Sequence, residues 1–142
     1  MEGTPNNSVQ LMEVSMIEMA LLKEVKDTEN KVRWDAKIDC ANFELYIPKW
    51  RVPEPWPSLI HVTILPYDRE QLLVLSKATA YKFPESRKSP IITHLKRFKE
   101  HTKTIRYQPE GDVTGWEIGE PYIPIPMTYD GADRLTITVQ WA

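Results

Sequence analysis

Apolar and polar residues alternate along three stretches of the chain, residues 31–39, 43–49 and 134–141. In the first stretch Val32 and Trp34 belong to an apolar set at every second position, with charged residues between them. Alternation at period two places one face of a strand against a core and leaves the other face in water. A three-residue break containing asparagine separates the first two stretches, which is compatible with an antiparallel hairpin. The pattern therefore predicts a sheet-based domain.

Further strands are predicted at residues 59–65, which are apolar and rich in β-branched side chains, and at residues 102–107. Residues 16–25 narrowly favour a strand, because they run into a polar turn that leads to the next strand. A helix is the alternative there, since apolar residues also recur at helical spacing. Residues 108–127 are rich in Gly, Pro and Asp and predict a loop.

The strongest helix signal begins at Ser89. A serine is a good N-cap, and Pro90 suits the first helical position, where its missing donor has no cost. Ile91, Leu95 and Phe98 then form an apolar stripe. These features predict a helix from Ser89 to about Phe98.

A second helix is predicted over residues 70–77, with Asp68 as its cap and Gln71 reaching back in a capping box. Residues 77–83 are equally compatible with a strand. Strands outnumber helices, and the two do not alternate strictly. The sequence therefore predicts an α+β fold, a largely antiparallel twisted sheet with one or two short helices packed on it.

The composition is that of one domain, with residues 1–8 as a flexible lead-in and residues 9–142 as a single α+β domain. A net charge of -2 gives no global attraction to nucleic acid or membranes. The polar first residues are unlike a signal peptide, and no stretch is apolar enough for a membrane helix. Cys40 is the only cysteine, which excludes a cysteine-based metal cage and favours a cytoplasmic location.

Charge is concentrated locally between residues 82 and 106. Eight basic residues and two acidic ones give this segment a net charge of +6, against -8 for the rest of the chain. Aromatic residues are interleaved with the basic ones, and such mixtures can stack bases while neutralising phosphates. The plainer interpretation is a solvated helix face with its flanking loops.

His61 and Thr63 lie two apart in the predicted strand at residues 59–65 and so share one face. They resemble half of the paired H-x-T signature of the 2H phosphoesterases, in which two histidines and two hydroxyls flank a cyclic phosphate. That family needs a second copy, and the residues after His94 and His101 do not supply it. A strand histidine that bonds a neighbouring carbonyl is the better interpretation. No metal site, phosphate loop or cofactor is predicted.

Trp50 and Trp56 lie in a stiff, proline-rich segment that could form a recognition surface or a lid over one end of the sheet. The leading hypothesis is a non-catalytic binding module that contacts a polyanion or an acidic partner, either protein or nucleic acid. Its predicted contact residues are Arg87, Lys88, Lys96, Arg97, Lys99, Lys103, Arg106, Trp50 and Trp56. One alternative is a small enzyme for a phosphorylated or carboxylated ligand, with His61 and Thr63 in a cleft. Another is a homo-oligomer formed through an edge strand.

Overall fold

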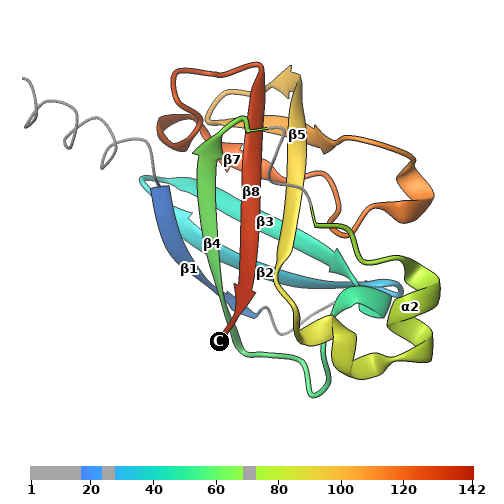
Figure 1. Cartoon of the computed structure of the whole chain (residues 1–142). Helices are drawn as coiled ribbons and strands as arrows, with labels where there is room; N and C mark the ends of the chain where they lie inside the picture. The colour runs from blue at the N-terminus through green and yellow to red at the C-terminus, as the bar shows by residue number, and fades with distance from the viewer. Residues whose placement is uncertain (1–16, 24–27, 69–72) are drawn as a thin grey trace, which may run out of the picture.

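A computed structural model describes residues 17–23, 28–68 and 73–142 and shows a closed antiparallel barrel of eight strands (Figure 1). Around the barrel the strands follow the order β1-β2-β3-β7-β6-β5-β8-β4, and β4 pairs with β1 to close the ring. The strands are β1 (Ile17–Lys23), β2 (Lys31–Ile38), β3 (Ala41–Pro48), β4 (Leu59–Pro66), β5 (Ile91–Glu100), β6 (Thr104–Pro109), β7 (Tyr122–Pro124) and β8 (Arg134–Trp141).

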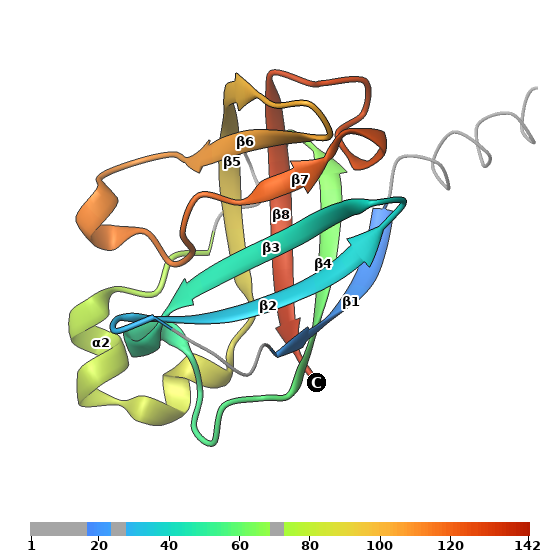
Figure 2. The same ribbon diagram turned by 180° about the vertical axis from the view of Figure 1, so that it is seen from behind.

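Short helical elements lie in the connections rather than in a layer of their own. One α-helix is found in the described residues, α2 (Lys77–Lys82). The four short 3-10 helices there are η1 (Lys49–Arg51), η2 (Pro84–Lys88), η3 (Val113–Gly115) and η4 (Ile125–Met127). Viewed from behind, α2 lies beside one end of the barrel and covers no sheet face (Figure 2).

The prediction of an α+β fold with an open sheet is wrong. β1 pairs with β2 along one edge and with β4 along the other, so the sheet closes on itself. The register between β1 and β4 joins Ile17 to Ile64 and Leu22 to Leu59. Alternation at period two specifies a half-buried strand, but an open sheet and a barrel both satisfy it. Closure depends on this pairing between segments far apart in sequence.

The predicted helix from Ser89 to Phe98 is also wrong, because these residues belong to β5. Ile91 and Leu95 satisfy a period of two as well as a helical period, and β5 bonds to β6 and β8 along its edges. Ser89 is the C-terminal cap of η2 and not the N-cap of a helix, and its carbonyl accepts hydrogen bonds from Arg51 and Trp141. Phe98 is 52% exposed and lies outside the core.

Residues 77–83 form a helix and not the alternative strand. Ser76 caps α2, since its hydroxyl accepts a hydrogen bond from the Thr79 amide at 3.1 Å. The capped helix predicted over residues 70–77 is wrong where the structure describes it, because Leu73 forms an isolated β-bridge with Ile92 and residues 74–76 belong to no helix. Gln71, the predicted capping-box residue, is among the residues that are not described.

The other strand predictions are confirmed. The ends of β2, β3, β4, β6 and β8 lie within two residues of the predicted ranges, and β1 confirms the strand preference for the described part of residues 16–25. The loop predicted over residues 108–127 contains one short strand, β7, that the sequence analysis missed. Three residues flanked by prolines are too few to show a period.

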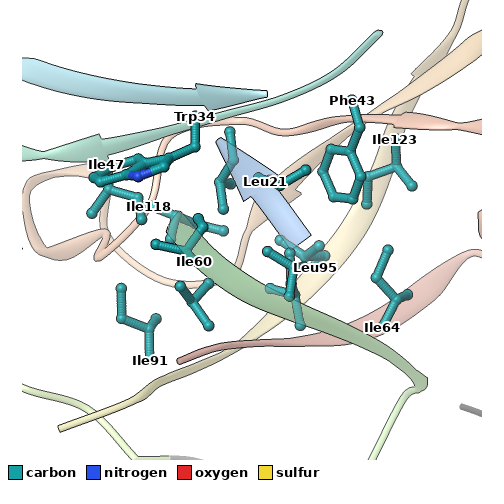
Figure 3. Packing of buried hydrophobic residues seen from close by; sticks show 14 of the residues in the cluster. Leu21, Trp34, Phe43, Ile47, Ile60, Ile64, Ile91, Leu95, Ile118 and Ile123 are labelled. Atoms are coloured by element: carbon teal, nitrogen blue, oxygen red, sulfur yellow. The ribbon is translucent and has the colours of Figure 1, made fainter. Parts of the chain in front are cut away.

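Every strand contributes buried side chains to one core inside the barrel (Figure 3). Trp34 is fully buried, and its indole N–H donates to the Pro57 carbonyl at 3.0 Å. Trp141 is only partly buried, with its ring centroid 6.2 Å from that of Trp34. An eight-stranded barrel is just wide enough for side chains to fill it. None of the helices in the described residues is long and apolar enough to span a membrane.

Candidate functional site

The basic residues of the 82–106 segment lie on several elements and not on one helix. The segment passes through α2, η2, β5 and β6, which point in different directions. Arg87 and Lys88 lie on η2, whereas Lys96, Arg97 and Lys99 lie on β5. The single helical face that would have gathered them does not exist.

Carboxylates neutralise several of these cations. Lys88 pairs with Glu85 at 2.8 Å, Arg97 pairs with Glu100, and Arg106 pairs with Glu120. The other three lysines named from the sequence, at positions 96, 99 and 103, are exposed and form no ion pair with another described residue. Glu85 and Glu100 are already counted in the net charge of +6, so only the pair with Glu120, which lies outside the segment, makes its positive potential weaker than that charge indicates.

A groove of about 910 Å³ lies on the outside of the barrel. One wall is α2, and the other is the connection from β6 to β7, with the end of β3 and η1 between them. Figure 2 shows both walls on the same side of the barrel. Five aromatic residues line this aromatic groove, namely Tyr46, Trp50, Tyr81, Trp116 and Tyr122.

The rings at the two walls are held in place by specific contacts. The Trp116 indole N–H donates to the Gly111 carbonyl at 3.1 Å. Tyr81 is 61% exposed, and the Arg87 guanidinium lies 5.5 Å from its ring centroid. Trp50 is 9% exposed and forms part of the floor. The Trp116 ring is thus fixed by a hydrogen bond and the exposed Tyr81 ring lies beside a guanidinium, whereas Trp50 presents little of its ring to the groove.

Three lysines accompany the rings in the aromatic groove. Lys31 and Lys77 are exposed and form no ion pair with another described residue, and Lys49 is half-buried. The acidic lining residues are Glu29 and Glu120, and Glu120 is occupied by Arg106 and by the Gln108 amide. The combination of flat rings and ammonium groups suits a ligand with both planar and anionic parts.

The Gly119 backbone joins one wall of the groove to β3. Its amide donates to the Tyr46 carbonyl at 2.7 Å. A Cβ at this position would lie 3.3 Å from the Lys31 ammonium and 3.4 Å from the Tyr46 backbone and Cβ. A Cβ here would fit against Tyr46 at van der Waals distance and would require only a small movement of the Lys31 side chain.

A buried ion pair ties the two walls together. Arg51 follows Trp50 in η1 and donates to Glu117 at 2.6 Å across to the β6–β7 connection. The same guanidinium donates to the carbonyls of Arg87 and Ser89, both at 2.8 Å, in the segment that follows α2. Both partners are almost fully buried. Arg51 is thus the common anchor of the groove.

Burial opposes the charged form of each partner. Desolvation lowers the pKa of Arg51 and raises the pKa of Glu117, and in both cases the mutual hydrogen bond acts in the opposite direction. The Leu75 backbone also bonds to Glu117 and lowers its pKa. The Arg51 guanidinium is surrounded by three backbone carbonyls and one carboxylate. Its donors are therefore used within the protein, and the cluster serves to position the walls of the groove.

The proline-rich segment around Trp50 and Trp56 closes one end of the barrel. Val52 is fully buried, and Trp56 packs partly buried against the core. Lys23 and Lys49 lie 5.4 and 5.3 Å from the centroid of the Trp56 ring. Of the two predicted tryptophans, Trp50 lines the groove and Trp56 does not.

None of the three histidines lines the groove, although His101 packs against the lining residue Tyr122. His61 is exposed on the outer face of β4, and neither His61 nor Thr63 lines the groove. His94 is 5% exposed and bonds to Thr136 through Nδ1 at 3.1 Å, while His101 packs against Tyr122. The described residues contain no cluster of three potential metal ligands.

A second, smaller hollow of about 330 Å³ lies at the turn between β2 and β3, and we call it the turn hollow. Cys40, Asn42, Glu44, Lys103 and Tyr122 are among its lining residues. Lys103 is the one cation of the 82–106 segment that lines either hollow. Tyr122 lines both.

Of the contact residues predicted from the sequence, Trp50 lines the groove and Lys103 lines the turn hollow, whereas Lys31, Tyr46 and Lys77 were not predicted. The groove lining comes from four separate segments, residues 28–31, 46–50, 77–81 and 113–122, so no local pattern joins it. The one available signal was the density of Trp and Tyr around residues 46–56 and 116–122. Comparison with protein-family models and with the curated proteins finds no match for this chain.

Proposed function

We propose that the protein is a non-catalytic binding module and that its ligand, a single-stranded nucleic acid, lies in the aromatic groove. The observation that carries this proposal is the placement of five aromatic rings and three lysines in one hollow. Base stacking on aromatic side chains contributes roughly 1–3 kcal/mol per base and tolerates any sequence. Ammonium groups beside the rings neutralise the phosphates.

The sequence predicted a polyanion-binding surface at residues 87–106, whereas we place the polyanion in the aromatic groove. An acidic peptide would use the lysines but has no need of the rings, and a proline-rich peptide would use the rings but has no need of the lysines. A nucleic acid uses both. The proposed compartment is the cytoplasm, where the single exposed thiol of Cys40 is unremarkable.

Fluorescence anisotropy with a labelled thymidine or uridine oligonucleotide of about eight nucleotides tests this function. Affinity should fall with salt, and each lysine that contacts a phosphate contributes about 0.7 to the logarithmic slope. Lys31→Ala and Lys77→Ala should each flatten the slope by that amount. Trp116→Ala should weaken binding by roughly 1–3 kcal/mol without changing the slope.

Lys96→Ala is the matched control, because Lys96 is exposed on β5 and lines neither hollow. Lys96 belongs to the basic stretch predicted from the sequence, so this variant distinguishes binding at that stretch from binding in the aromatic groove. A loss for Lys96→Ala equal to that for Lys77→Ala would return the site to the linear stretch. Binding of polyglutamate in place of oligonucleotides would assign the groove to an acidic protein, and absence of binding at about 50 mM salt would reject the proposal.

A further inference from the structure

Tyr122 belongs to both hollows on the barrel surface. It lines the aromatic groove on one side and the turn hollow on the other. Its cross-strand partner in β3 is Glu44, which lines the turn hollow as well. The two hollows therefore meet at this pair of residues.

The outward-facing residues of β3 connect the hollows along a straight line. Pro48 and Tyr46 line the aromatic groove, and the next two residues at period two, Glu44 and Asn42, line the turn hollow. From Pro48 to Asn42 the strand spans about 20 Å at 3.4 Å per residue. This distance is several nucleotides long.

We infer that the nucleic acid does not end in the aromatic groove but continues along β3 and across Tyr122 into the turn hollow, where Lys103 meets its backbone. This inference rests on the proposed function and extends the same site. Lys103 is exposed and forms no ion pair with another described residue. It supplies the turn hollow with its only cation among the described lining residues.

Aromatic residues mark the crossing between the hollows. The Tyr122 ring lies 5.5 Å from that of His101 and 5.9 Å from the Arg106 guanidinium. On its other side Arg106 lies 4.8 Å from the exposed Phe98 ring. A base that stacks at Tyr122 is thus flanked by the guanidinium plane of Arg106, which is itself paired with Glu120.

The crossing also contains an opposing charge. Glu44 and Asp35 are cross-strand partners and share Arg33, at 3.4 and 2.8 Å. One guanidinium faces two carboxylates, so this point is net negative. A strand that crosses it should bind more tightly when Glu44 is made neutral.

Cys40 is a natural reporter for the inferred path, since it is the only cysteine, is exposed and lines the turn hollow. The experiment measures its alkylation rate by iodoacetamide in the wild-type protein at saturating oligonucleotide. An oligomer of about twelve nucleotides should slow alkylation severalfold, and one of about four should not. Anisotropy on the same samples confirms saturation.

Variants locate the contact. The wild type should bind the long oligomer more tightly than the short one. Lys103→Ala should remove most of this gain in affinity and leave the affinity for the short oligomer unchanged. Glu44→Gln should increase that gain. Lys96→Ala should change neither value.

Equal alkylation with and without a saturating long oligomer would overturn the inferred path and leave the groove as the site. Protection by the short oligomer would overturn it too, because the turn hollow would then be the primary site. If no oligomer binds, both the path and the proposed function fail. A Lys103→Ala variant that binds short and long oligomers as the wild type does would reject Lys103 as a contact.

Discussion

Arg51 and Glu117 form an ion pair inside the protein, with 2.6 Å between Nε and Oε2, and they join two connections that are far apart in sequence. Such a pair holds geometry more than it adds stability, because both charges leave water. Here the fixed geometry is that of the groove walls.

Arg51→Met should lower the free energy of unfolding by roughly 3–5 kcal/mol, because it leaves the Glu117 carboxylate buried without its partner. Adding Glu117→Leu should restore part of this loss. The remainder reflects the backbone carbonyls that Arg51 also bonds. Urea denaturation measures both values, and a double variant no more stable than Arg51→Met would contradict the account.

The difference between these two variants should depend on pH. Burial raises the pKa of Glu117 in the folded state, and loss of Arg51 removes an effect that lowers it. The pKa of Glu117 is therefore higher in the folded than in the unfolded protein, so protonation of this carboxyl favours folding. The resulting stabilisation is present below the unfolded pKa and is lost as pH rises through the folded pKa. The two variants should therefore be equally stable near pH 3–4 and diverge toward neutral pH. Denaturation series from acidic to neutral pH test this, and a gap that widens on acidification would be the contrary result.

Tyr107 should give the barrel an alkaline limit. Burial raises the pKa of Tyr107 to about 12, and its hydroxyl donates to the Ala132 carbonyl at 2.7 Å. Its contribution is fully present below about pH 10 and is lost as pH rises toward the folded pKa. The stability advantage of the wild type over Tyr107→Phe should be about 1 kcal/mol at neutral pH and shrink above pH 10. A constant advantage across this range would mean that Tyr107 titrates normally.

Substitutions of Trp34 and Trp141 should differ in their effect on stability. Trp34→Ala should cost roughly 3–5 kcal/mol, because the ring is fully buried. Trp141 lies in an alternating strand that also predicts it on the core side, but it is only partly buried and packs against the core, so Trp141→Ala should cost roughly half as much. Unfolding midpoints of the two variants provide the measurement. Equal losses would show that the rim is packed as tightly as the core.

Glu120→Gln should strengthen oligonucleotide binding severalfold and steepen its salt dependence. The substitution removes a carboxylate from the groove lining and releases Arg106 from its charged partner. Glu85→Gln is the matched control, because Glu85 also pairs with a cation but lies outside both hollows. Anisotropy titrations compare the two. Weaker binding for Glu120→Gln would show that Glu120 recognises the ligand directly.

Local pattern was sufficient for most strands, since the side-chain period of a strand is a property of neighbouring residues. β2 and β8 follow from the alternation around Trp34 and Trp141 alone. β5 did not follow, because Ile91 and Leu95 fit a period of two and a helical stripe equally well, and only its pairing with β6 and β8 decides between them.

The sequence by itself thus determined that the chain makes a half-buried antiparallel sheet, with Trp34 in its core. The tertiary structure decided that the sheet closes between β1 and β4, that Arg106 is neutralised by Glu120, and that Lys31, Trp50, Lys77 and Trp116 meet in one groove. The reason is that alternation is encoded within a few residues. Closure, ion pairing and groove formation join segments that are distant along the chain, and their free energies depend on geometry that no local pattern carries.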